Sequence, residues 1–263
     1  MTRSRVVTNL RVVAALSRRS IKQTFRRPQF LAPILLFPSL FLAVNTGGAS
    51  RATDLPGFPE VAGFLDFELA GAMMQSAMLS GLSGGIALAL DIEIGFLDRL
   101  VASPIARSTM ILGRLTATAV LGILTAVWFL AVGLIFGAEI KAGIPGMLLV
   151  LLLTPLAAGA FGTIGAALAL KSGKPSVVQG LFPIVFVILF LSSAFFPRQL
   201  LLEPAKTIAD WNPLSFIAEA LRDPIVSDVS LEPLAKGVGG IALIGFVGIS
   251  LSALALRARL RAG

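Results

Sequence analysis

One short stretch of the chain has the spacing of a serine nucleophile. Gly81-Leu82-Ser83-Gly84-Gly85 matches the pattern Gly-x-Ser-x-Gly, in which a serine hydroxyl is positioned to attack a carbonyl carbon. Such a serine needs a neighbouring base to take its proton. The chain contains no histidine, and the predicted membrane spans contain no lysine or aspartate. We therefore reject the catalytic interpretation and expect the glycines to serve close helix packing.

Other reactive side chains are missing from the sequence. It has no cysteine and no histidine, which excludes disulfides, thiol chemistry and zinc sites built from these ligands. It also lacks the phosphate-binding loop Gly-x-x-x-x-Gly-Lys-Ser/Thr, because Gly173-Lys174 has no upstream glycine at that spacing and is followed by proline. We expect this chain to be no enzyme by itself and to bind no metal or cofactor.

Charges of both signs gather in residues 91–107. Glu93, Asp98 and Arg99 lie off an apolar helical face. Pro104 disfavours helix at the residue before it, so the helix should stop there. That apolar face consists of Ile92, Phe96, Leu97, Leu100 and Val101. The pattern predicts a short amphipathic helix along a membrane surface, with a plain interfacial loop as the alternative.

The elements around this stretch are strongly apolar. Hydrophobic residues make up 56% of the 263 residues and charged residues only 14%, against about 25% charged in a soluble domain. Six charge-free runs of at least 20 residues are each long enough to cross about 30 Å of hydrocarbon as a helix. They cover residues 28–50, 69–90, 115–138, 142–170, 175–197 and 237–256. The sequence therefore predicts an all-α integral membrane protein with six spans.

The loops between these runs differ in charge. The termini and the loops on their side hold 16 basic and 3 acidic residues, whereas the other side holds 6 basic and 11 acidic residues. Because cytoplasmic loops are enriched in lysine and arginine, both termini are expected in the cytoplasm. The net charge of +8 is then explained by contact with anionic membrane lipid, and no nucleic-acid partner is expected.

Two further segments are not predicted to span. Residues 1–27 carry eight basic groups and no acid, with apolar residues at roughly helical spacing, which indicates an amphipathic interfacial helix ahead of Pro28. Residues 197–236 are too polar to span and too long for a turn, and Asn212-Pro213 marks a turn within them. We expect a helical hairpin there on the extracellular side, either re-entrant or on the surface, with a solvated loop as the alternative.

Two motifs resemble those of a known family, the ABC type-2 permeases. The first is Glu93-x-Gly95-x-x-Asp98-Arg99-Leu100-x-x-Ser103-Pro104-x-x-Arg107, which is similar to the family's coupling helix after the second span. Asp98 stands where many relatives have glutamate. The second is similar to the family's extracellular stretch between spans five and six, and comprises Phe196-Pro197-Arg198, Trp211-Asn212-Pro213-Leu214-Ser215-Phe216 and Leu221-Arg222.

The resemblance covers the chain as one domain, residues 1–263, and is greatest to drug-resistance permeases of the daunorubicin-efflux type. It implies a permease subunit in the bacterial cytoplasmic membrane that exports a lipophilic or amphipathic drug or lipid. It also implies two copies of a P-loop ATPase partner, which bind ATP and Mg, and a second permease chain, identical or related. In that family the residues from Glu93 to Arg107 form the coupling helix that contacts the ATPase.

Two other functions remain open at this stage. An ion-coupled secondary transporter usually has ionisable groups near the membrane midplane and repeated halves. The predicted spans contain no Asp, Glu, Lys, Arg or His, and we see no internal repeat. A membrane anchor or assembly protein that transports nothing would need no coupling helix. The transported molecule and the residues that line its path are not specified by the sequence.

Overall fold

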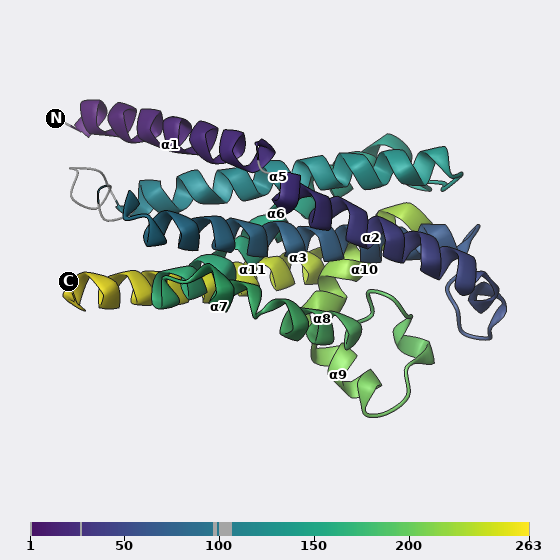
Figure 1. The fold of residues 1–263 in the computed structure, drawn as a ribbon. Helices are drawn as coiled ribbons and strands as arrows, with labels where there is room; N and C mark the ends of the chain where they lie inside the picture. The colour runs from purple at the N-terminus through teal and green to yellow at the C-terminus, as the bar shows by residue number, and fades with distance from the viewer. Residues whose placement is uncertain (1, 27, 97–98, 100–106, 263) are drawn as a thin grey trace.

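The computed structural model is a bundle of helices. It describes residues 2–26, 28–96, 99 and 107–262, and the regular elements within them are all helical. The long helices are α1 (Thr2–Phe25), α2 (Pro28–Gly48), α3 (Phe64–Glu93), α5 (Arg107–Ile135), α6 (Gly143–Ser172) and α11 (Leu231–Ala262). The short ones are η1 (Ser50–Asp54), α7 (Pro175–Gln179), α8 (Phe182–Phe190), η2 (Arg198–Leu200), α9 (Ala205–Trp211) and α10 (Pro213–Val226). Both chain termini lie at the same end of the bundle (Figure 1).

Five helices in the described residues are long and apolar enough to cross a membrane, namely α2, α3, α5, α6 and α11. The expected single helix over 175–197 was wrong, since this segment forms α7 and α8 and then leaves helical geometry after Phe190. The physical reason for the first break is Pro183, which has no N–H to donate to the carbonyl four residues earlier. Because of this break, the count of six spans stays a prediction.

Helix α3 lies at the centre of the bundle, between α2, α5, α6 and α10 (Figure 1). Its contact with α6 is made through glycines. A Cβ atom added to Gly81 would lie 2.5 Å from Phe161 Cβ, and one added to Gly85 would lie 2.6 Å from Gly165 Cα. No side chain fits at either position without displacing α6. The prediction that these glycines serve close helix packing is therefore confirmed.

The ends of α3 correct the sequence prediction. The expected span 69–90 stopped at the nearest acids, but the helix runs on at both ends and includes Asp66, Glu68 and Asp91, all of which are buried. Thirty residues make a helix about 45 Å long, whereas the hydrocarbon core is about 30 Å thick. The acids therefore lie near the two ends of α3, where neighbouring groups bind them. The predicted span 69–90 itself contains no ionisable residue, and the three acids belong to the parts of α3 on either side of it.

The N-terminal and C-terminal segments complete the bundle. Helix α1 was predicted from residues 1–27 and packs against α5, where Ser17 Oγ donates to the carbonyl oxygen of Gly113 over 3.4 Å. Helix α10 contacts α3, α6 and α11. The segment between α8 and α11 is therefore no solvated loop, because α10 buries apolar side chains such as Ile217 and Leu221 in the main core.

Candidate functional site

At the end of the bundle that holds the termini, α1 is fastened to the end of α3. The guanidinium of Arg19 donates to both carboxylate oxygens of Asp91, over 3.2 Å and 3.1 Å. The side chain of Asp91 is 3% exposed, and that of Arg19 is 37% exposed. The same guanidinium lies 3.7 Å from the ring centre of Phe96, which adds a cation–π contact. Arg19 therefore ties α1 to the start of the predicted coupling segment.

The chain leaves α3 by a turn at Gly95. Gly95 has a φ of +68°, a left-handed conformation that residues with a Cβ rarely adopt. Arg99 donates from its side chain to the carbonyls of Gly95 and Ile94, each over 3.4 Å, and so covers carbonyls near the C-terminal end of α3. Arg99 and Glu93 are both exposed. Charges of opposite sign are thus available to a partner on this surface.

The structure tests only part of the predicted coupling segment. Glu93 ends α3, Phe96 contacts Arg19, and Arg107 begins α5. The other residues expected in this segment, Leu97, Asp98, Leu100, Ser103 and Pro104, lie outside the described residues. The helix predicted over them stays a prediction.

At the opposite end, Arg222 of α10 holds together the chain that follows α8. Its Nε donates to the carbonyl of Phe67 over 3.1 Å, Nη1 to that of Ser193 over 3.0 Å and Nη2 to that of Ala194 over 2.6 Å. The guanidinium also stacks 3.7 Å from the ring centre of Phe67. Burial lowers the pKa of Arg222 to about 10 against the opposing effect of Glu219, so this side chain stays charged at neutral pH.

Asn212 makes a second set of bonds to the same stretch of backbone. Its Nδ2 donates to the carbonyls of Ile188 and Leu191 over 2.9 Å and 3.1 Å, and its Oδ1 accepts from the backbone N–H of Leu214. Asn212 is thus the N-cap of α10, and Pro213 is well placed at its first position, where no intrahelical N–H is needed. Non-helical backbone is tolerated at membrane depth where protein groups form hydrogen bonds to it, and the side-chain amide of Asn212 donates two such hydrogen bonds.

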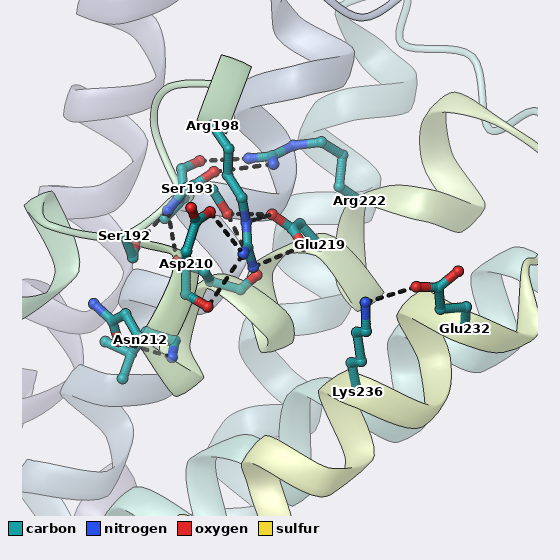
Figure 2. A network of polar contacts seen from close by, with 12 residues as sticks. Ser192, Ser193, Arg198, Asp210, Asn212, Glu219, Arg222, Glu232 and Lys236 are labelled. Carbon is teal, nitrogen blue, oxygen red and sulfur yellow. Dashed lines mark hydrogen bonds and ion pairs between the residues drawn. The ribbon is translucent and has the colours of Figure 1, made fainter. Parts of the chain in front are cut away.

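An ion-pair network lies over this backbone (Figure 2). Glu219 accepts from Ser193 Oγ over 2.7 Å and from two nitrogens of Arg198, over 2.5 Å and 3.0 Å. Arg198, directly after Pro197, also pairs with Asp210 over 3.3 Å. A hollow of about 250 Å³ opens beside Arg198, Glu219 and Arg222. Arg198, Asn212 and Arg222 of the second motif therefore join η2, α9 and α10 to the end of α8, whereas Trp211 of the same motif is 83% exposed.

A third polar group lies between α2 and α3. Asn45 of α2 donates to Glu68 Oε1 over 2.8 Å, while Glu68 Oε2 and both polar atoms of Gln75 are buried without a hydrogen-bond partner among the described residues. Glu68 and Gln75 lie seven residues apart, on one face of α3. Buried polar atoms of this kind are costly unless another molecule binds them.

Sequence reasoning missed several of these residues. Arg19 and Asp91 are 72 positions apart, and nothing in their spacing indicates that they meet. Glu68 was assigned to a loop because a single charge ended the apolar run. Arg222 was found only through the family resemblance, whereas Asn212 was also identified as part of an Asn-Pro turn, and the network shows the physical basis for both residue types.

The sequence also matches a family model. Residues 11–226, which include the buried network and the segment between α3 and α5, match the model described as ABC-2 type transporter. The chain belongs to this family. The family resemblance predicted from the two motifs is therefore confirmed, as is the assignment of the chain to a membrane-embedded transport permease.

Curated relatives agree with this assignment. The chain is 28% identical over 217 residues to a ycf38 protein of Porphyra purpurea that is named as a candidate transport permease, with 80% of this chain and 72% of the relative covered. It is 26% identical over 200 residues to the daunorubicin resistance ABC transporter permease protein DrrB1 of Streptomyces coeruleorubidus, with 74% of this chain and 68% of the relative covered.

Proposed function

We propose that this chain is the membrane subunit of an ATP-driven exporter and that a separate P-loop ATPase supplies its energy. The observation that supports this most is the surface at the end of α3. There a bilayer-spanning helix ends in exposed Glu93, and the left-handed turn at Gly95 leads to exposed Arg99. A partner that binds these two charges could move α3, and Arg19 would transmit the movement to α1.

The transported molecule is proposed to be lipophilic or amphipathic, as a drug or a lipid is. The bundle is largely apolar, and two residues of α3, Glu68 beside Asn45 of α2 and Gln75 seven positions further on, offer hydrogen bonds to a polar group on such a molecule. The relative named for daunorubicin resistance supports a drug. A lipid remains the second candidate, because the apolar face of α2 is open on the outside of the bundle.

The proposed assembly contains two permease chains, identical or related, and two ATPase subunits that bind ATP and Mg. We place it in a bacterial cytoplasmic membrane with both termini in the cytoplasm, which is supported by the 16 basic and 3 acidic residues on the side of the termini. In this arrangement α7, α8 and the following backbone make up the remaining span, and the network of Arg222 lies at the extracellular end.

The test is to isolate the tagged full-length protein from its native membranes in mild detergent and to identify what accompanies it. We expect a P-loop ATPase, and we expect its yield to fall at least tenfold in the double variant Glu93→Lys, Arg99→Glu. The matched control is Glu232→Lys, which reverses an exposed acid at the opposite end of the bundle and should leave the ATPase bound.

Either of two outcomes would count against the proposal. Recovery of the chain alone from several detergents, with no ATP hydrolysis, would favour an ion-coupled transporter or a membrane anchor. An ATPase that remains bound to the double variant would remove Glu93 and Arg99 from the contact.

A further inference from the structure

An apolar groove opens on the surface of the bundle near the termini. Its volume is about 480 Å³, within the range of about 300–1,000 Å³ of ligand pockets. Helix α6 lines it from Ile164 to Lys171, α11 lines it from Leu251 to Ala258, and Leu181 lies in the turn between α7 and α8. Lys171 is the one charged residue of the lining, and the remaining lining residues are all apolar.

The groove runs along the axes of the two helices. Helices α6 and α11 run in the same direction, since Ser252 Oγ donates to the carbonyl of Thr163 and Leu256 packs with Leu170. Eight residues on each helix, with a rise of about 1.5 Å from each to the next, make a groove about 10 Å long, compared with about 15 Å for half of the hydrocarbon core. Its charged end therefore lies near the membrane surface, and its apolar end points toward the midplane. An acyl chain of a phospholipid lies in this same direction.

Positive charge lies at the mouth of the groove, where Lys171 lines it. The two segments that line the groove, residues 164–171 and 251–258, contain no acid. Lys171 is exposed. Of the acids at the nearby end of α3, Asp91 is ion-paired with Arg19, and Glu93 is exposed. A phosphate group at the mouth would therefore meet an excess of positive charge.

We propose that this groove binds one acyl chain of an anionic phospholipid from the leaflet on the side of the termini, with the lipid phosphate at Lys171. A second copy of this chain is a poorer occupant, because its own terminal side would add further basic groups at the same place. The lipid would fill the space beside the break between α7 and α8, and so would support the packing of this segment against α6 and α11. The proposal concerns lipid binding and does not depend on export or on an ATPase.

The test is native mass spectrometry of the full-length protein, purified in detergent and incubated with equal amounts of phosphatidylglycerol and phosphatidylcholine. The wild-type protein should retain one phosphatidylglycerol with at least a fivefold preference. Lys171→Gln should bind both lipids equally. Lys174→Gln removes an exposed base three residues further on that does not line the groove, and this control should keep the wild-type preference.

A second variant tests the groove itself. Ala255→Phe places a ring in the groove from α11 and should reduce retention of both lipids at least fivefold, with an unchanged elution volume as the check of folding. Unchanged lipid retention in both Lys171→Gln and Ala255→Phe would overturn the proposal. A chain dimer without bound lipid, dissociated by Ala255→Phe, would also overturn it and would show that a second copy covers the groove.

Discussion

Replacement of Arg222 by lysine should loosen the backbone that follows α8. The guanidinium binds the carbonyls of Phe67, Ser193 and Ala194 at once, whereas the compact lysine ammonium can reach one of them. The carbonyl of Phe67 keeps its bond within α3, but one of the carbonyls of Ser193 and Ala194 is left without a partner, at about 1–3 kcal/mol. We expect the local free energy of opening to fall by about 1–3 kcal/mol.

The absence of cysteine in the chain gives a direct assay. A single cysteine at Ala194, which is 0% exposed, would react with a membrane-impermeant maleimide only when this segment opens. If opening and closing are fast, the labelling rate follows the population of the open form. A decrease of about 2 kcal/mol corresponds to labelling roughly 30 times faster, because about 1.4 kcal/mol is a factor of ten.

The matched control is Arg198→Lys. The side chain of Arg198 is 20% exposed, and its partner Asp210 is 45% exposed, so these ion pairs are partly in water. Exposed pairs contribute about 0–1 kcal/mol, which predicts a change in labelling of less than about fivefold. Labelling in Arg222→Lys that is no faster than in Arg198→Lys would refute the view that Arg222 secures the backbone.

Two further predictions concern helix contacts. Gly81→Ala should lower the free energy of unfolding by about 1–3 kcal/mol, because its Cβ would meet Phe161. The control is Gly159→Ala in α6, which has open space around it and should be neutral or slightly stabilising. Equal melting temperatures of the two variants in detergent would contradict the close contact between α3 and α6. In a double-mutant cycle, Arg19→Gln and Asp91→Asn should show a coupling free energy of up to about 1 kcal/mol for unfolding, since Arg19 is partly exposed. Additive effects of the two substitutions on thermal unfolding would show that the pair does not join α1 to α3.

The sequence predicted the apolar helices well, because each contains a long charge-free run. It failed where an acidic residue lies inside a helix, as Glu68 does, since the hydrogen bond that Asn45 donates to this residue comes from another helix. It also failed for the segment after Phe190. An unbroken apolar run predicts one helix. The hydrogen bonds that stabilise the non-helical backbone come from Asn212 and Arg222, which lie more than 20 positions further along the chain.

In the candidate site, too, local patterns were predicted from the sequence and contacts between distant residues were not. Local spacing was enough to select Glu93 and Arg99, whose side chains are exposed. The absence of histidine from the chain, and of lysine and aspartate from the predicted spans, was enough to reject Ser83 as a nucleophile. Local spacing gave no indication of Arg19, because a basic residue in an amphipathic helix is expected to face lipid or water. Pairing across 72 positions depends on how α1 docks, which follows from the packing of the whole bundle.

The glycine contact between α3 and α6 gives spectroscopists a frame of reference. In α3, 94% of the most apolar window is buried, compared with 17% in α2 and in α11. Two helices whose backbones meet without intervening side chains cannot change their separation or rotate freely past each other. Distances measured by spin labels or fluorophores should therefore be referred to α3 and α6, and probes on the outer faces of α2 and α11 should report the displacements of a working cycle.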